Sequence, residues 1–331
     1  MMNNEASQHP YDRLTPEVIL SAIETALDVR CSGALQALNS YENRVYRIDI
    51  EDAAPLAAKF YRPGRWSNAA IEEEHEFTLE LAAQEVPVVA PLQAGGKSLL
   101  EHEGFRFALY PWAPGRRPEL NHREDRVRLG RYLGRMHSLG AARPFQHRIT
   151  LGVENYGHDA VAFLMQSDFI PDYLRGSYEQ ISQLVLQQTE SIMQQYRPQR
   201  LLRLHGDFHL SNVLTWEDNY YVVDLDDTLM GPAMQDLWML LEGSDDDMRQ
   251  QLNELLEGYE MFYPFDRHEV GLMEALRSLR LLHYSAWLGR RWQDPAFPYN
   301  FPWFDTPRYW EEQVQNLQEQ LAKLQQPPLQ L

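Results

Sequence analysis

Short apolar runs and alternating apolar and polar residues dominate the first third of the chain, which is the pattern of β-strands. Strands are predicted over residues 34–38, 45–50, 56–61 and 105–110, with polar turns between them. After Gly115 the spacing changes, and apolar residues recur every three or four positions, as they do along one face of a helix. The pattern predicts an α+β fold, with a small antiparallel sheet first and a mainly helical part after it.

The stretch 111–115, Pro-Trp-Ala-Pro-Gly, is typical of a linker because proline and glycine interrupt helices and strands alike. We therefore expect a bilobal protein, with an N-terminal lobe over residues 1–111 and a C-terminal lobe over residues 112–331. The N-terminal lobe should contain one main helix over residues 68–84, with Ser67 as its N-cap.

The acidic residues of this helix differ in the face on which they lie. Ile71 and Phe77 fall on one stripe at helical spacing, and Glu74 falls on the same stripe. A carboxylate on a buried face needs a cationic partner, and Lys59, inside the apolar strand 56–61, is the natural one. Glu73 is the alternative if the phase of the helix is shifted by one residue.

A hairpin is predicted in the C-terminal lobe. Residues 213–215 are apolar and β-branched, residues 216–219 are a polar break of turn length, and residues 220–223 form the return strand. Because an antiparallel hairpin brings its outer ends together, Asn212 and Asp224 should be neighbours in space.

The residues at and before the ends of this hairpin suit phosphoryl transfer. The amide oxygen of Asn212 and the carboxylate of Asp224 are hard ligands of the kind that Mg²⁺ prefers. Asp207, slightly earlier in the chain, can orient or deprotonate a hydroxyl nucleophile. The structural alternative is a surface hairpin flanked by solvated turn residues. A zinc site built from His205 and His209 is disfavoured because their spacing falls on a loop.

The motif His-Gly-Asp-x-His-x-x-Asn at 205–212, followed by an apolar strand and Asp-x-Asp, resembles the aminoglycoside phosphotransferase and choline kinase superfamily, relatives of protein kinases. In that comparison Asp207 matches the catalytic-loop aspartate, Asn212 the metal-binding asparagine and Asp224 the aspartate of the D-F-G element. The chain also resembles, more specifically, the bacterial stress response kinase A family, or YihE protein kinases. The segments that carry this second resemblance are 39–46, 59–63, 224–227, 231–241 and 294–303.

The resemblance implies nucleotide-binding roles for three residues of the N-terminal lobe. Ser40 lies in the turn 39–44, where its hydroxyl and the backbone N–H groups would meet phosphate oxygens, although the turn lacks the glycines of the kinase pattern. Lys59 would pair with the α- and β-phosphates, and Glu74 would hold Lys59 in place. Without the resemblance, the same residues fit a plain hairpin turn and a lysine on a solvated face.

Composition and charge restrict the class of protein. The 331 residues are 44% hydrophobic and carry a net charge of −18, which argues against general nucleic-acid binding because that requires a basic face. The single cysteine, Cys31, cannot form an intramolecular disulfide and fits a reducing cytoplasm. No apolar run approaches the roughly 18 residues needed to span a bilayer, and residues 1–10 lack the features of a signal peptide. We expect a cytoplasmic protein that binds neither nucleic acid nor membranes.

The resemblance implies a protein-kinase-like fold and Mg²⁺-dependent transfer of the γ-phosphoryl group of ATP to a hydroxyl. The family's activity is that of a serine/threonine protein kinase that phosphorylates itself and acts in bacterial stress response; we expect a monomer with protein substrates. The main alternative is a small-molecule kinase for an amino alcohol, sugar or antibiotic, because an activation segment has no room between Asp224 and Gly231. A pseudokinase scaffold is disfavoured because Lys59, Asp207 and Asn212 are all present alongside Asp224.

Two further features concern the C-terminal lobe. Asp236 resembles the superfamily's buried helix acid that braces the catalytic loop. A basic aromatic patch fits packing better than a substrate surface, and its members are Arg280, Trp287, Arg290, Arg291 and Trp292.

Overall fold

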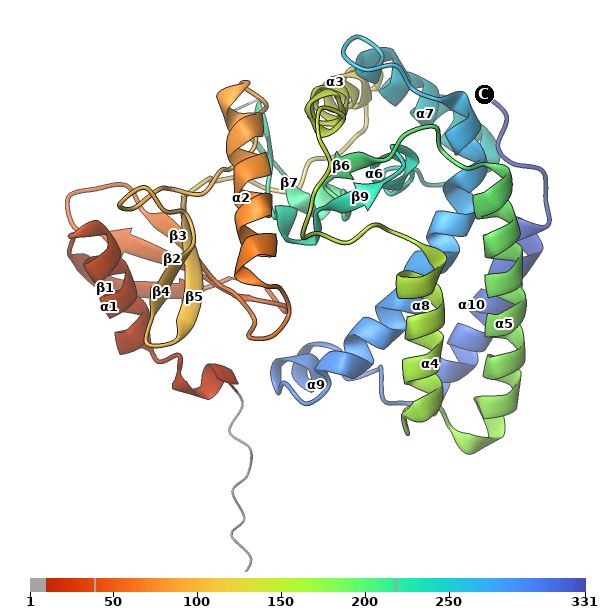
Figure 1. Cartoon of the computed structure of the whole chain (residues 1–331), viewed down its shortest axis with the longest axis horizontal. Coiled ribbons are helices and arrows are strands. Elements are labelled where there is room, and N and C mark those ends of the chain that lie inside the picture. The colour runs from red at the N-terminus through yellow and green to blue at the C-terminus, as the bar shows by residue number, and fades with distance from the viewer. Residues whose placement is uncertain (1–9, 39, 218) are drawn as a thin grey trace, which may run out of the picture. The chain divides into compact units, whose positions relative to one another are not determined.

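A computed structural model describes residues 10–38, 40–217 and 219–331, which form two compact units (Figure 1). The first unit takes in the chain up to Glu119 together with Phe145–Arg148 and Leu210–Asp226, and the second holds the remainder. The first unit thus includes residues 112–119, 145–148 and 210–226. The boundary expected from the sequence placed these three segments in the C-terminal lobe. The functions assigned to the two lobes stay predictions. The expectation for the N-terminal tail, apart from Pro10, lies outside the described residues.

The sheet of the first unit is antiparallel and five-stranded, in the order β1-β2-β3-β5-β4. Its strands are β1 Cys31–Ala37, β2 Arg44–Ile50, β3 Leu56–Phe60, β4 Leu100–His102 and β5 Phe105–Pro111. The predicted strands are confirmed, although the first begins at Cys31 and not at Ala34. Lys59 lies on the central strand, opposite Val45 of β2 and Ala108 of β5.

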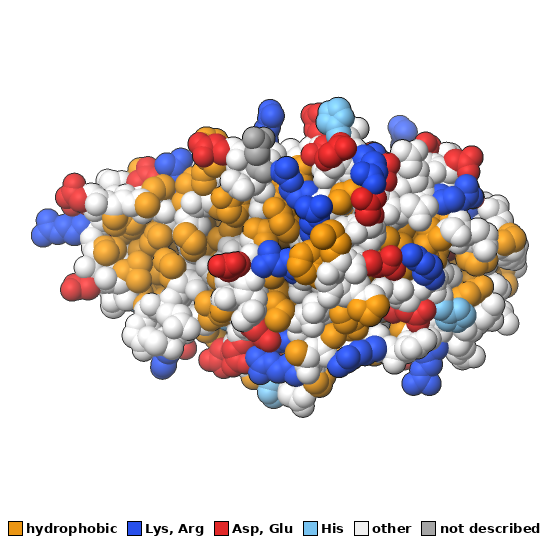
Figure 2. All heavy atoms as spheres, turned by 90° about the horizontal axis from the view of Figure 1, so that it is seen from above, with side chains coloured by type: hydrophobic (Ala, Val, Ile, Leu, Met, Phe, Trp, Pro, Cys, Tyr) orange, Lys and Arg blue, Asp and Glu red, His pale blue; other side chains and the backbone are white. Residues whose placement is uncertain are grey.

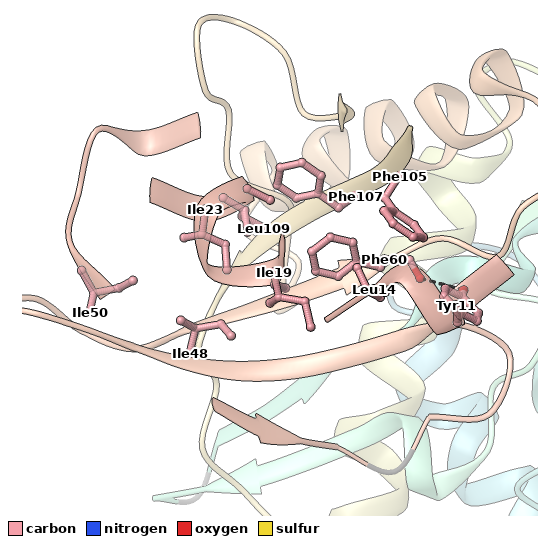
Figure 3. Close-up of a cluster of buried hydrophobic side chains, with 12 residues drawn as sticks. Tyr11, Leu14, Ile19, Ile23, Ile48, Ile50, Phe60, Phe105, Phe107 and Leu109 are labelled. Carbon is pink, nitrogen blue, oxygen red and sulfur yellow. Dashed lines mark hydrogen bonds between the residues drawn. The ribbon is translucent and has the colours of Figure 1, made fainter. Parts of the chain in front are cut away.

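One face of this sheet is buried by the helix α1, Pro16–Leu27 (Figure 3). Ile19 and Ile23 of α1 pack against Phe60 and Phe107, whose rings stack at 5.2 Å. Because successive side chains of a strand point to opposite faces, the burial of Phe60 in this core turns Lys59 toward the other face of the sheet.

The main helix of the first unit, α2, spans Asn68–Ala83, and Ser67 caps it by accepting a hydrogen bond from the N–H of Ala70 at 3.1 Å. Both predictions are confirmed. Ile71 of α2 packs against Ala108 in a second apolar cluster.

The predicted hairpin is confirmed and belongs to the first unit. It consists of β7, Val213–Trp216, and β8, Asn219–Val222, with Val213 opposite Val222. The N–H of Val223 donates to the carbonyl of Asn212 at 3.0 Å, which ties the two outer ends of the hairpin together.

The second unit is built from helices around one short strand pair, β6 and β9 (Figure 1). Its α-helices are α3 Arg123–Gly140, α4 Asp159–Gln166, α5 Asp172–Gln195, α6 Met234–Trp238, α7 Asp245–Tyr259, α8 Met273–Arg291, α9 Ala296–Asn300 and α10 Pro307–Leu324. The strands are β6 Leu202–Leu204 and β9 Leu229–Gly231. The short helical turns of both units, among the described residues, are η1 Pro10–Arg13, η2 Glu154–His158, η3 Leu210–Asn212, η4 Leu225–Asp227 and η5 Arg267–Leu272. The turn η5 leads directly into α8.

Figure 2 shows acidic and basic side chains interspersed with apolar ones over the face that it displays. Within the described part of the chain, no helix is both long enough and apolar enough to cross a membrane.

Helices α3 and α7 approach closely through glycines. A Cβ added at Gly130 of α3 would lie 1.9 Å from the carbonyl oxygen of Leu255, and one at Gly258 of α7 would lie 1.9 Å from the carbonyl oxygen of Val127. These positions require glycine because the obstructing atoms belong to the backbone of the facing helix and cannot rotate away.

We predict that Gly130→Ala lowers the free energy of unfolding by about 1–3 kcal/mol, because the added methyl group forces the two helices apart. Gly176→Ala in α5 is the matched control, since a Cβ there meets nothing within 4 Å, and the better helix propensity of alanine should stabilise the protein by up to about 1 kcal/mol. Urea unfolding followed by circular dichroism measures both. Equal stability of the two variants would contradict the close helix contact.

Candidate active site

A cavity of about 360 Å³ lies within the first unit and gathers the predicted nucleotide and metal residues. Its lining includes all five of them, Ser40, Lys59, Glu74, Asn212 and Asp224. The remaining wall is largely apolar and comes from the sheet, the segment 110–115 and the hairpin. A cavity of this size with a few convergent polar groups is typical of a small-ligand site. The sixth predicted residue, Asp207, belongs to the second unit.

Lys59 is buried and forms two ion pairs. Its Nζ lies 2.9 Å from Oδ1 of Asp224 and 3.2 Å from Oδ1 of Asp226. Burial alone would lower the pKa of Lys59, but the charges of Asp224, Asp226 and then Glu74 hold it well above its ordinary value. The lysine is therefore a permanent cation on the wall of the cavity.

Glu74 is fully buried on the core face of α2, together with Ile71 and Phe77, which confirms the predicted helix phase. Its ion pair, however, goes to Arg148, with Nη2 3.6 Å from Oε2, and not to Lys59 as expected. The ion-pair partners of Lys59 are instead Asp224 and Asp226. Burial raises the pKa of Glu74 to about 7, and the charges of Lys59 and Arg148 oppose that rise.

Glu73 also has a structural partner, which sequence reasoning did not foresee. Its carboxylate accepts backbone N–H groups of Gln146, His147 and Arg148 at 2.6, 2.7 and 3.1 Å. Glu73 and Glu74 thus both contact the segment 146–148. Glu73 binds the backbone of this segment, and Glu74 pairs with the guanidinium of Arg148.

Arg148 joins α2 to the segment that carries Asp224. Its Nε donates to the carbonyl of Ala70 at 2.7 Å, and its Nη1 donates to the carbonyl of Asp226 at 2.7 Å. Arg65 forms an ion pair with the carboxylate of Asp226. Burial would raise the pKa of Asp226, but the charges of Arg65, Lys59 and Arg148 hold it well below its usual range.

The turn that holds Ser40 is fixed by side-chain contacts and not by glycine. The hydroxyl of Ser40 donates to the carbonyl of Asn43 at 3.1 Å, and Oδ1 of Asn43 accepts the N–H of Arg62 at 3.1 Å. The guanidinium of Arg62 donates to the carbonyl of Glu42 and pairs with its carboxylate, both at 2.9 Å. These contacts anchor the turn to the end of β3. The preceding residue, Asn39, lies outside the described residues.

Asn212 and Asp224 both face the cavity from the outer ends of the hairpin. Asp224 has a φ of 59°, a left-handed conformation that aspartate adopts more readily than most residues. Its side chain is 56% exposed, so the carboxylate is accessible. An amide oxygen and a carboxylate fit Mg²⁺, which binds through one or two protein carboxylates and completes its shell with water and substrate phosphates.

The catalytic-loop motif of the second unit is braced by Asp236, as the resemblance implied. Its carboxylate accepts the N–H groups of His205 and Gly206 at 2.9 Å each, and it lies 3.1 Å from Nε2 of His137. His137, in the last turn of α3, is fully buried within this brace. Gly206 has a φ of 85°, and an added Cβ would lie 2.2 Å from the carbonyl of Asp227, so the turn requires glycine.

The contacts of Asp207 include Arg280, His209 and His205. Its Oδ1 lies 2.5 Å from Nη1 of Arg280, its Oδ2 lies 3.3 Å from Nε2 of His209, and its N–H donates to Nδ1 of His205 at 3.3 Å. Burial would raise the pKa of the Asp207 carboxyl, but the hydrogen bond from His209 and the charge of Arg280 hold it well below its usual range. The interpretation of Arg280 as a packing residue was therefore wrong, because it contacts the predicted catalytic aspartate.

Comparison with known proteins gives a consistent assignment. Residues 34–273 match the profile of APH, the phosphotransferase enzyme family. The chain is 44% identical over 331 residues to the stress response kinase A of Escherichia coli strain K12, covering 100% of this chain and 99% of that protein. It is 43% identical, with the same coverage, to the serine/threonine protein kinase RdoA of Salmonella typhimurium.

Solved structures show the same fold. The amicoumacin kinase hAmiN, in complex with AMP-PNP, Ca²⁺ and Ami, superposes with a TM-score of 0.73 at 17% identity and covers 95% of this chain and 94% of its own. A microcompartment-associated aminopropanol kinase gives a TM-score of 0.70 at 19% identity and covers 94% and 98%. The predicted α+β, protein-kinase-like fold is confirmed.

The profile match covers most of the chain, and the relatives align with it from end to end. The chain is thus a phosphotransferase with an alcohol group as acceptor, and it belongs to the phosphotransferase enzyme family and, within it, to the stress response kinase A family.

Proposed function

We propose that this protein is an ATP- and Mg²⁺-dependent serine/threonine protein kinase that phosphorylates itself and acts, as a cytoplasmic monomer, in bacterial stress response. The observation that carries the proposal is the single cavity lined by Ser40, Lys59, Glu74, Asn212 and Asp224. The protein specificity is supported by the names of the full-length relatives, one of which is called a serine/threonine protein kinase.

In the proposed reaction, the cavity binds ATP and positions its phosphates. Lys59 binds the α- and β-phosphate oxygens, and the turn at Ser40 covers the phosphates. Asn212 and Asp224 hold Mg²⁺, which neutralises phosphate charge when it is bound. Glu74 supports Lys59 electrostatically, since each of the two shifts the pKa of the other toward its charged form.

Asp207 is the residue assigned to the acceptor. The oxygen of the acceptor hydroxyl forms a bond to the γ-phosphorus while the bond from that phosphorus to the bridging oxygen breaks, so that ADP leaves. The hydroxyl proton passes to the carboxylate of Asp207. Because this carboxyl has a pKa well below its usual range, its main task is to orient the hydroxyl, and it takes the proton late.

A small-molecule acceptor is the second candidate, and one observation favours it. Only the short turn η4 and the strand β9 separate Asp224 from the helix α6, which begins at Met234. This leaves no long activation segment of the kind on which many protein kinases bind peptides. Two proteins of the same fold, named an aminopropanol kinase and an amicoumacin kinase, support the same candidate.

The deciding experiment is incubation of the purified protein with Mg²⁺ and ATP labelled at the γ-phosphate, alone, with protein mixtures and with a panel of amino alcohols, sugars and aminocyclitols. The proposal expects label on serine or threonine of the protein itself and of added proteins, and none when EDTA is present. Label transferred only to small alcohols would replace it with the second candidate.

We predict that Asp207→Asn lowers the turnover number by about 10²–10⁴-fold, because the acceptor hydroxyl loses its proton acceptor. The affinity for Mg-ATP should change less than about twofold, since the binding residues are others. Single-turnover phosphorylation and calorimetric titration measure the two effects. Turnover within tenfold of the wild type would exclude Asp207 as the proton acceptor.

We predict that Asn212→Ala and Asp224→Ala each weaken Mg-ATP binding by at least about tenfold, because each removes one of two protein ligands of the cation. Asn219→Ala is the matched control, since this exposed asparagine begins the second strand of the same hairpin. Calorimetry with Mg-ATP and with metal-free ATP separates a loss of metal binding from a loss of direct nucleotide binding. The metal assignment fails if the loss is the same with and without Mg²⁺.

A further inference from the structure

Arg280 lies on α8 and contacts Asp207, which lies 73 positions earlier in the chain. Its Nη1 donates to Oδ1 of Asp207 at 2.5 Å, and the side chains are 37% and 23% exposed. Among the described residues, Asp207 is the only hydrogen-bond or ion-pair partner that the guanidinium has. The hydrogen bonding of this guanidinium is thus directed at Asp207.

Other arginines of the same helix are used differently. Arg277, one turn earlier, pairs with Glu274 at 2.8 Å and lies over the ring of Trp238 at 5.4 Å. Arg290, near the end of α8, donates to the carbonyl of Asp159. Arg277 therefore offers a control of the same residue type on the same helix, with no contact to Asp207.

The orientation of Asp207 depends on a few groups. From its own loop His205 accepts its N–H and His209 faces Oδ2, whereas α8 contributes Arg280 at Oδ1. Arg280 thus places a guanidinium charge directly at this carboxylate.

We propose that Arg280 is a positioning residue for phosphoryl transfer: its guanidinium fixes the orientation and the negative charge of the Asp207 carboxylate that receives the acceptor's proton. This inference rests on the proposed function. A misplacement of a reacting group by about 1 Å can cost about 10²-fold in rate. The contact therefore predicts a loss in turnover without a loss in nucleotide binding.

The kinetic test compares Arg280→Gln, Arg280→Lys and Arg277→Gln. Arg280→Gln should lower kcat by about 10²-fold, leave the KM for ATP within about twofold and move the acid limb of kcat/KM to higher pH. The acid limb moves to higher pH because the loss of a neighbouring cation raises the pKa of a carboxyl. Arg280→Lys keeps the charge and should recover part of both effects, whereas Arg277→Gln should behave as the wild type.

A second measurement does not depend on turnover. The chemical shift of the Asp207 carboxyl carbon is measured against pH by ¹³C NMR of protein labelled with ¹³C at aspartate. Its signal is identified as the one that is lost in Asp207→Asn. In Arg280→Gln the protonation midpoint should lie at least about one pH unit above that of the wild type and of Arg277→Gln. Identical titration in all three proteins would overturn the inference, even if the wild type proves inactive as a protein kinase. A shifted titration in a protein that phosphorylates only small alcohols would instead overturn only the proposed protein specificity, whereas a protein without any phosphoryl transfer would overturn both the proposed function and this inference.

Discussion

Buried charge neutralisation around Lys59 is the interaction on which the first unit depends. Lys59, Arg65 and Arg148 are set against Asp224, Asp226 and Glu74, and most of these groups are nearly inaccessible to water. Removing one partner of a buried ion pair leaves an uncompensated charge and typically costs about 3–5 kcal/mol. The cluster joins β3, α2, the segment 145–148 and the end of the hairpin, so the elements that line the cavity are held by the same charges that would serve the nucleotide.

This arrangement relates the structure to the proposed chemistry. Lys59 is bound by Asp224, the residue assigned to the metal, and by Asp226, which is fully enclosed. We expect that a cation on Asp224 weakens its hold on the lysine, while Asp226 keeps the lysine at the cavity wall. The ammonium group would then be free to meet phosphate oxygens. Glu74, with a pKa of about 7, gains negative charge in the neutral range and reinforces the lysine there.

Local patterns were sufficient for the features that depend on neighbours in sequence. The spacing of Ile71, Glu74 and Phe77 gave the buried face of α2, and the runs on either side of the turn at 216–219 gave the hairpin. Periodicity states which face a residue occupies but not which distant residue it meets. For that reason the pairing of Lys59 with Asp226, across 167 positions of the chain, could not be foreseen.

The same limit explains the residues that sequence reasoning missed. Arg148 lies in an irregular segment without apolar spacing. Arg280 lies on a helix with several arginines, and the sequence does not indicate which of them has a partner outside the helix. Their partners, Asp226 and Asp207, are fixed only by the folded chain. Glu73 is a further case, because its sequence position does not indicate that its carboxylate accepts three backbone N–H groups.

The most direct measurement is an anomalous-scattering crystal structure of the protein with Mn²⁺ and a non-hydrolysable ATP analogue. The predicted result is one strong manganese peak within bonding distance of the amide oxygen of Asn212 and the carboxylate of Asp224, with Nζ of Lys59 at the α- or β-phosphate. A peak remote from both residues, or an analogue bound outside the cavity lined by Lys59, would contradict the assignment of this cavity as the site of phosphoryl transfer.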